Sequence, residues 1–211
     1  MPGAATLATF AGISLLLAVT PGPDMAVVTR SALAYGRRGV FLTTCGNALA
    51  LLLWVIATAV GVAALLRTSA LLFSLVKIIG AAYLVYLGVR AWWGSRQTAA
   101  AAAPAPATRA DFRSFSQFRI GFVSASTNPK LGVFFVTFLP QFVNRDSPAL
   151  LQLLVLGGMF ALVGWTWMNI YGLAVTRLRE IITAPSVRRW MDRATGTVLV
   201  GLGLRLALDR A

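Results

Sequence analysis

Long apolar runs separated by short polar segments account for most of the chain. An α-helix needs about 20 consecutive apolar residues to cross the hydrocarbon core of a bilayer, and most of the runs reach this length. The pattern therefore predicts an all-α membrane protein with six transmembrane helices. The expected helices cover 4–35 with an interruption at 21–23, 40–66, 70–93, 118–143, 150–175 and 194–208.

Two of these runs are interrupted by proline, each time next to an ionisable residue. Proline has no amide hydrogen, and its ring clashes with the preceding helical turn. Backbone groups freed inside a bilayer must be satisfied by protein or water, so a break there predicts a protein-lined or wet cavity. The simpler alternative is a kink, or a helix that ends at the membrane surface. The two interruptions are Thr20-Pro21-Gly22-Pro23-Asp24 and Thr127-Asn128-Pro129-Lys130.

The chain reads as two halves with the same pattern. Pro23-Asp24 aligns with Pro129-Lys130 in the first run of each half, and the third runs resemble each other at 80–90 and 196–205. With three spans in each half, the halves must be inserted in opposite orientations. Inverted repeats with matching broken helices indicate a transporter site at the repeat interface. We expect one membrane transport domain, 1–211, with repeat one at about 1–94, a flexible Ala/Pro-rich linker at about 95–111 and repeat two at about 112–211.

Composition excludes several other classes of protein. The chain is 58% hydrophobic and only 12% charged, against about 25% charged residues in ordinary soluble domains. Its net charge of +13 comes from arginines between apolar runs, as in cytoplasmic loops, so we expect no nucleic-acid partner. There is no His, and Cys45 is the single cysteine, which leaves zinc, haem and histidine-based catalysis without their usual groups. We therefore expect no enzyme, no cofactor and no resident metal.

The ends of the broken helices predict the chemistry of the site. A half-helix N-terminus offers amides to a carboxylate, and a half-helix C-terminus offers carbonyls to a cation. Together with Asp24 and Lys130, these ends provide groups for a zwitterion. Asp24 then faces a substrate ammonium or carries a coupling proton, and the alternative is a structural ion pair with Lys130. The other candidates are Pro21, Gly22, Pro23, Asn128 and Pro129 at the breaks, and Asn47, which lines the pathway or only bonds between helices.

The chain resembles the RhtB/LysE family of amino-acid exporters over almost its full length. The motifs that carry the resemblance are Pro21-Gly22-Pro23-Asp24, Arg37-Arg38-Gly39, the segment 80–90 and Asn128-Pro129-Lys130. The resemblance implies a six-span exporter in the bacterial inner membrane for amino acids or close derivatives, such as homoserine and its lactones, threonine or lysine, driven by the proton gradient. Expected partners are then the amino acid, the bilayer and protons, with a homodimer left open.

Three other functions compete with this interpretation. A metal-cation exporter of similar architecture is weakened by the lack of His and of clustered intramembrane carboxylates, because Asp24 alone is a poor divalent site. A membrane-embedded enzyme needs a nucleophile–base or metal constellation, and the sequence offers none. A non-transporting assembly factor would not need paired helix breaks.

The distribution of arginines predicts the orientation in the membrane. Cytoplasmic loops carry an excess of Lys and Arg. If the N-terminus faces outward, the inner segments hold far more arginines than the outer ones, so both termini are expected outside and the linker inside. The inner arginines are Arg30, Arg37, Arg38, Arg96, Arg109, Arg113, Arg119, Arg177, Arg179, Arg188, Arg189 and Arg193, and the outer ones are Arg67, Arg145, Arg205 and Arg210.

This orientation can be tested with a single introduced thiol. In a Cys45→Ala background, Ala103→Cys should resist an impermeant thiol reagent applied to intact spheroplasts, because the linker is expected in the cytoplasm. The same variant should react once the membrane is permeabilised. Ready labelling in intact spheroplasts would overturn the orientation.

Overall fold

The computed structural model describes residues 2–68, 70–97, 114–144, 147–178 and 184–208, and within these ranges it contains helices and no strand. The expectation of an all-α protein is therefore confirmed. The predicted linker begins inside a helix, and the rest of it lies outside the described residues. The elements are α1 (Ala4–Val19), α2 (Pro23–Thr68), α3 (Ala70–Gln97), α4 (Ser114–Ser126), α5 (Pro129–Val133), the π-helical turn η1 (Phe134–Phe138), the 3₁₀ turn η2 (Leu139–Phe142), α6 (Ala149–Arg177) and α8 (Pro185–Leu208).

Both proline interruptions are observed as breaks between helices. Thr20, after the last residue of α1, has an extended backbone with φ −62° and ψ 117°. Asn128, between α4 and α5, is likewise extended with φ −73° and ψ 109°. The next helix starts at a proline each time, Pro23 for α2 and Pro129 for α5. Proline suits this first position because its fixed φ is helical and its missing amide hydrogen would have no partner there.

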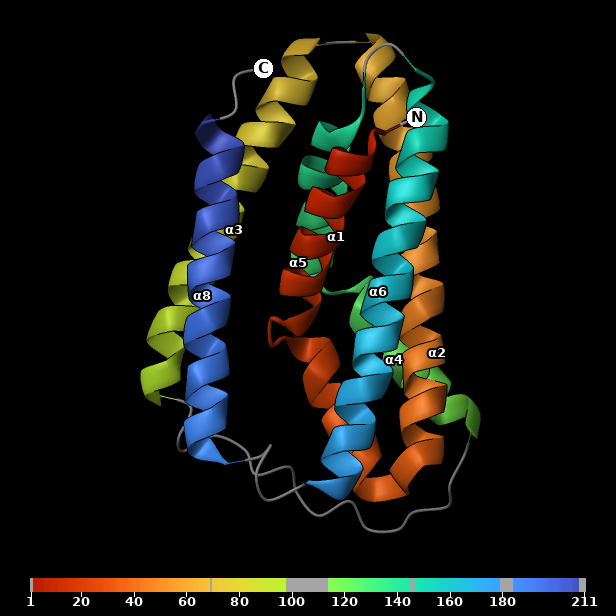
Figure 1. Ribbon diagram of the computed structural model, residues 1–211, viewed down its shortest axis with the longest axis vertical. Coiled ribbons are helices and arrows are strands. Elements are labelled where there is room, and N and C mark those ends of the chain that lie inside the picture. The colour runs from red at the N-terminus through yellow and green to blue at the C-terminus, as the bar shows by residue number, and fades with distance from the viewer. Residues whose placement is uncertain (1, 69, 98–113, 145–146, 179–183, 209–211) are drawn as a thin grey trace.

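Glycine at position 36 folds α2 back on itself. Gly36 has φ 60° and ψ −148°, a conformation that residues with a Cβ rarely adopt. The two arms of α2, residues 23–35 and 37–68, therefore run in opposite directions, as Figure 1 shows at the lower end of the molecule. Thr43 Oγ1 on the second arm donates a hydrogen bond of 2.8 Å to Ser31 Oγ on the first. Gly39 allows this close return, because a Cβ there would lie 2.7 Å from the Ser31 carbonyl oxygen.

The helices form two groups with the broken segments between them. In Figure 1, α3 and α8 lie side by side, the second arm of α2 lies beside α6, and α1 and α5 lie in the middle. Glycines bring the paired helices together: a Cβ on Gly88 of α3 would lie 2.8 Å from the Gly196 carbonyl oxygen of α8, and one on Gly196 would lie 2.7 Å from that of Gly88. Small residues at such crossings are typical of packed membrane helices.

Within the described residues, two helical segments are long and apolar enough to cross a membrane, Pro23–Gly61 and Ala149–Arg177. Two shorter apolar segments there are Ala4–Val19 and Ile78–Arg90. The first and fourth predicted spans are each split by a break, which shortens their continuous helices. The last helix begins at Pro185 rather than near 194, so the expected start was wrong. Arginine is a good helix former even though it lowers hydropathy. A prediction from hydropathy therefore missed the first turns of α8, which contain several arginines.

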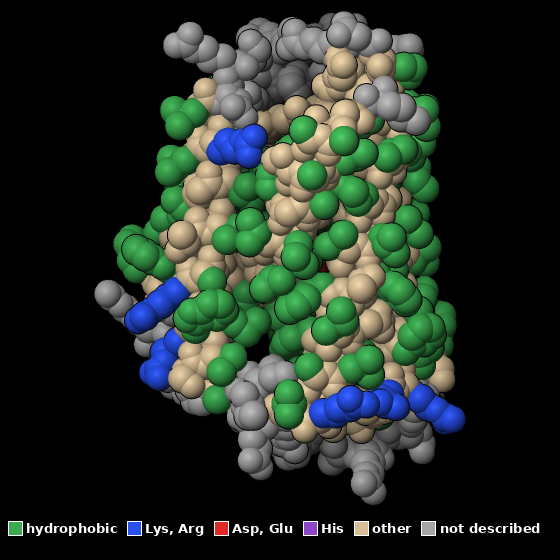
Figure 2. Space-filling view, in the orientation of Figure 1, with side chains coloured by type: hydrophobic (Ala, Val, Ile, Leu, Met, Phe, Trp, Pro, Cys, Tyr) green, Lys and Arg blue, Asp and Glu red, His purple; other side chains and the backbone are tan. Residues whose placement is uncertain are grey.

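The surface is largely apolar along the sides of the molecule. Hydrophobic side chains cover the flanks in Figure 2, and the Lys and Arg side chains visible on this face lie mostly toward the lower end, where α2 turns back. Exposed apolar area of this extent marks a surface that contacts lipid or protein rather than water. Large exposed side chains include Leu16, Phe41, Ile56, Ile79, Leu162 and Ile170.

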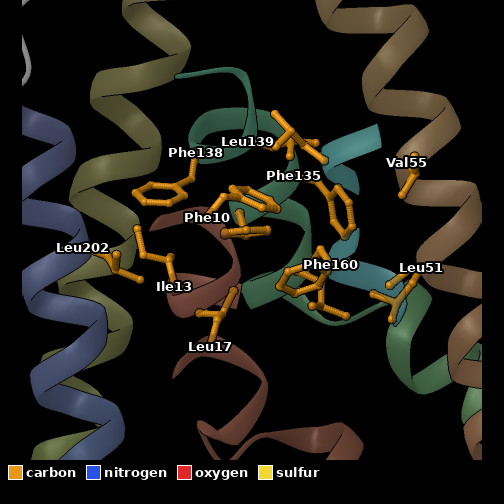
Figure 3. Packing of buried hydrophobic residues seen from close by; sticks show 14 of the residues in the cluster. Phe10, Ile13, Leu17, Leu51, Val55, Phe135, Phe138, Leu139, Phe160 and Leu202 are labelled. Carbon is orange, nitrogen blue, oxygen red and sulfur yellow. The ribbon is translucent and has the colours of Figure 1, made fainter. Parts of the chain in front are cut away.

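Phenylalanines fill the centre of the bundle (Figure 3). Phe10 of α1 is fully buried, and Phe134, Phe135 and Phe138 of η1 gather around it together with Phe160 of α6. The rings of Phe134 and Phe160 lie 4.5 Å apart between centroids. The wide π-helical turn follows the short helix α5, which begins at the second break, so the break also affects where these rings enter the core.

The second arm of α2 packs against α4 without intervening side chains at Gly46 and Gly121. A Cβ on Gly46 of α2 would collide with the Phe118 carbonyl oxygen, and one on Gly121 of α4 would collide with the Thr43 carbonyl oxygen. The contact is backbone against backbone, so a methyl group cannot be accommodated by a change of rotamer.

We expect Gly121→Ala to lower the free energy of unfolding by about 1–3 kcal/mol, because the added methyl group overpacks this crossing. The measurement is the thermal midpoint of the detergent-purified protein. Gly61→Ala is the matched control, because a Cβ at Gly61 would meet no atom within 4 Å. Equal midpoints for the two variants would contradict the close packing of α4 on α2.

Candidate functional site

Asp24 is buried where the two broken helices meet. It lies in the first turn of α2, where the helix dipole favours a negative charge, and its side chain is 5% exposed. Ser124 Oγ donates to Oδ1 at 2.6 Å, and Asn128 Nδ2 donates to Oδ2 at 2.6 Å. Both donors belong to the second half of the chain, so a carboxylate of the first half is satisfied by the second.

Lys130 makes the reciprocal connection from the second half to the first. Its side chain is 8% exposed, and Nζ donates to the Leu17 carbonyl oxygen at 3.2 Å and to that of Thr20 at 2.9 Å. In an unbroken helix the amide of residue 21 would donate to the Leu17 carbonyl, but Pro21 has no amide hydrogen. The ammonium group replaces that donor and also places a cation at the C-terminal end of α1, where the helix dipole favours it.

The second break is completed in a similar way. The Ala125 carbonyl oxygen would accept from residue 129 in an unbroken helix, but that residue is Pro129. Trp54 Nε1, on the second arm of α2, donates to this oxygen at 3.3 Å. Asn128 Oδ1 accepts the backbone N–H of Lys130 at 3.0 Å, so the same side chain that donates to Asp24 also caps α5.

The structure brings most of the predicted site residues together, with two differences. No hydrogen bond joins the side chains of Asp24 and Lys130: the ammonium donates to two carbonyls, and Asn128 bonds the Asp24 carboxylate and the backbone N–H of Lys130. The alternative of a structural pair stays a prediction, which exchange of the two charges tests. Asn47 is 4% exposed, but its Oδ1 has no hydrogen-bond partner.

The prolines and Gly22 shape the site without supplying polar groups to it. Pro23 and Pro129 are exposed, whereas Pro21 is half-buried. Gly22 lies beside the ammonium group, since a Cβ built on it would be 3.5 Å from Lys130 Nζ.

A hollow of about 530 Å³ lies elsewhere, where Thr6 of α1, Gln141 of η2 and Arg205 of α8 meet. Its lining does not include Asp24, Asn128 or Lys130. We place the candidate site at the breaks, because buried charges with partners from both halves require a built arrangement, whereas a hollow between helix ends does not.

The residues around Asp24 are poorly suited to a divalent cation. One carboxylate, one hydroxyl and one amide meet there, whereas Ca²⁺ takes about 6–8 oxygen ligands, several of them carboxylates. No group of three or more His, Cys, Asp or Glu side chains gathers in the part of the chain that the structure describes.

Comparison with known proteins identifies the family. The family model described as "LysE type translocator" matches residues 15–210. The chain belongs to the LysE family. The resemblance found in the motifs is thereby confirmed, and so is the expectation of a membrane transporter rather than an enzyme.

Several curated relatives match this LysE-family translocator over nearly their full length. An uncharacterized membrane protein, YrhP, of Bacillus subtilis is 27% identical over 97% of this chain and 99% of its own. A homoserine/homoserine lactone efflux protein of Salmonella typhimurium is 30% identical over 93% of each chain. A leucine efflux protein of Salmonella choleraesuis is 26% identical over 92% of this chain and 91% of its own. No solved structure gives a significant match.

The sequence did not reveal several partners at the translocator's candidate site. Ser124 lies one helical turn before Asn128, so its place on the same face could have been inferred from spacing. Trp54 carries no such signal, because its role depends on how the second arm of α2 crosses α4. The sequence indicates that the carbonyls of Leu17 and Thr20 need donors. It does not indicate which side chain supplies them.

Asn128→Ala should lower the free energy of unfolding by about 2–4 kcal/mol, because it removes the cap of α5 and one donor to a buried carboxylate. Thermal unfolding of the purified protein in detergent measures this. Thr127→Val is the matched control, since Thr127 is exposed and its hydroxyl donates to the Val123 carbonyl oxygen of its own helix at 2.8 Å. A loss of stability no larger than the control's would show that the bridge contributes nothing.

Proposed function

We propose that this translocator exports amino acids or close derivatives, and that the two helix breaks form its substrate site. The observation that carries the proposal is the reciprocal bonding of the breaks: Asp24 is held by α4 and the residue before α5, and Lys130 is held by the end of α1. Buried ionisable residues inside a membrane domain mark substrate or ion pathways. The names of two relatives, which describe efflux of homoserine and its lactone and efflux of leucine, support the substrate class.

A zwitterion can compete for both charged groups. Asp24 is bonded to two neutral donors, and Lys130 to two neutral carbonyls. A substrate ammonium would offer Asp24 a charged donor, and a substrate carboxylate would offer Lys130 a charged acceptor. Hydrogen bonds between two ionised groups are stronger than those with one neutral partner. We infer that the substrate inserts between the two breaks by replacing these internal partners.

The proposed architecture is six spans in two inverted repeats. In this architecture α1, α2 and α3 correspond to α4, α6 and α8. The contacts support it, because α1 packs on α6 as its counterpart α4 packs on α2, and the counterparts α2 and α6, like α3 and α8, pack on each other. Each side-chain hydrogen bond of Asp24 and Lys130 crosses from one proposed repeat to the other. Substrate that replaces these bonds would release the two repeats from each other, which ties binding to the rocking motion of alternating access.

Asp24 is our candidate for the coupling proton as well. A carboxylate that accepts a proton no longer attracts the substrate ammonium, so protonation and substrate binding would exclude each other at this residue. Exchange of a proton for substrate then follows. We place the protein in the bacterial plasma membrane, with both termini outside.

Transport from proteoliposomes tests the function. The native protein should release preloaded radiolabelled leucine or homoserine, and an imposed proton gradient should drive uphill accumulation on the opposite side. Asp24→Asn keeps shape and polarity but cannot ionise, so it should retain exchange of substrate for substrate and lose uphill transport. Thr127→Val is the control, because Thr127 is exposed and its hydroxyl bonds within its own helix, and it should behave as the native protein does.

The double variant Asp24→Lys with Lys130→Asp separates this proposal from a structural ion pair. Breaking a buried pair costs roughly 3–5 kcal/mol, and the swap would restore a pair. We expect no restored transport, because Ser124 and Asn128 are placed to bond a carboxylate. Rescue of stability and transport by the swap would rule out Asp24 as the proton carrier. If the native protein released none of a broad panel of amino acids, the proposal of amino-acid export would be wrong.

A further inference from the structure

Polar side chains continue from Asp24 along the contact between α2 and α4. Asp24 and Ser31 are seven residues apart on α2, and Ser124 and Gln117 are seven residues apart on α4, so each pair lies on one helical face, two turns apart. Ser124 donates to Asp24 at 2.6 Å, and two turns further along Ser31 Oγ donates to Gln117 Oε1 at 3.0 Å.

Thr43 of the second arm of α2 joins the pair formed by Ser31 and Gln117. Its hydroxyl donates to Ser31 Oγ at 2.8 Å, and Ser31, Thr43 and Gln117 are all buried. Asn47, one turn beyond Thr43, approaches α4 between the two pairs, since a Cβ on Gly121 would lie 2.9 Å from its Oδ1. We call Ser31, Thr43, Asn47 and Gln117 the polar seam.

Asn47 is the unsatisfied position in the seam. Its side chain is 4% exposed, and Oδ1 has no hydrogen-bond partner. A buried acceptor left without a donor costs about 1–3 kcal/mol, and native proteins leave few of them. Because Asn47 lies between two hydrogen-bonded polar pairs, a donor that enters along them would satisfy this oxygen, and water and a primary ammonium group are donors of suitable size.

The seam leads to the end of the molecule that carries Arg37 and Arg38. A hollow of about 440 Å³ is lined there by both arginines, Phe41, Leu42 and Ser114. Leu42 directly precedes Thr43 of the seam, and Ser114 lies one turn before Gln117. The hollow is therefore adjacent to the last polar group of the seam, and its guanidinium groups would attract the carboxylate of an amino acid.

We propose that the polar seam is the route between this arginine-bearing end and Asp24, and that Asn47 is an intermediate binding site for water and for the ammonium group of the substrate. The proposal rests on the proposed function for the identity of the substrate. The helices here touch through Gly46 and Gly121, with no side chain between them at those points. A small separation of α4 from α2 would therefore open the seam along its length, in keeping with helix shifts in alternating access.

Thiol accessibility tests the route without relying on transport. In a Cys45→Ala background, Asn47→Cys and the nearly isosteric Ser31→Cys are treated with a small charged thiol reagent from each side of the membrane. Arg38→Cys marks the arginine-bearing side. Both seam variants should react from the side that labels Arg38→Cys, at least about tenfold faster than Thr58→Cys, which corresponds to ~1.4 kcal/mol less free energy for opening.

The controls separate a route from general loosening. Thr58 is 3% exposed and its hydroxyl has no partner, so it matches Asn47 in burial on the same arm of α2 but lies outside the seam. Leu49→Cys lies on the exposed apolar surface and should react slowly with a charged reagent from either side. Leucine or homoserine at saturating concentration should slow the labelling of Asn47→Cys and leave Arg38→Cys unchanged.

Labelling of the seam variants no faster than Thr58→Cys, or from the side opposite Arg38→Cys, would overturn the route. If Asn47→Cys fails to insert, Ser31→Cys decides by the same criterion. Failure of the proposed function has a different signature: the native protein would transport no amino acid and labelling would be insensitive to amino acids, while fast labelling from the arginine-bearing side would still support the seam as an aqueous route.

Discussion

The need to satisfy backbone carbonyls freed by proline inside an apolar bundle governs this structure. Lipid offers no hydrogen bonds, so each carbonyl that loses its helical donor must find another within the protein. The Leu17 carbonyl finds the ammonium of Lys130, and the Ala125 carbonyl finds the indole N–H of Trp54. The backbone N–H of Asn128 also donates to the Ala125 carbonyl, at 3.4 Å, so the second break is completed partly from within and partly by the second arm of α2, whereas the Leu17 carbonyl depends on Lys130 of α5.

This requirement links the two halves of the chain at their helix breaks. Lys130 follows one break and bonds the helix end at the other, while Asp24 follows the first break and bonds the helix end and cap at the second. At the breaks, the halves are joined by a few charge-assisted bonds, in addition to the helix packing around them. A ligand with two opposite charges would compete for just these bonds, and in the proposed exporter this competition makes the fold responsive to substrate.

Glycine and phenylalanine determine how firmly the remaining surfaces pack. Glycines at the crossings of α2 with α4 and of α3 with α8 let backbones touch, so these contacts can separate without displacing side chains. The phenylalanines of η1 fill the centre of the bundle, where they pack against α1 and α6. The molecule thus combines an aromatic core on one side of the breaks with a polar, glycine-lined contact on the other.

The sequence by itself determined the helical class, the two breaks, the family and the candidate pair Asp24 and Lys130, because proline chemistry and hydropathy act locally. It misplaced the start of α8, since arginines lower hydropathy without opposing a helix. Only the tertiary structure decided that Asn128 bridges Asp24 and Lys130, that Trp54 completes the second break, and that Asn47 keeps an oxygen without a donor. These features depend on how helices far apart in sequence cross one another, and crossing geometry is set by packing of whole surfaces rather than by any local pattern of residues.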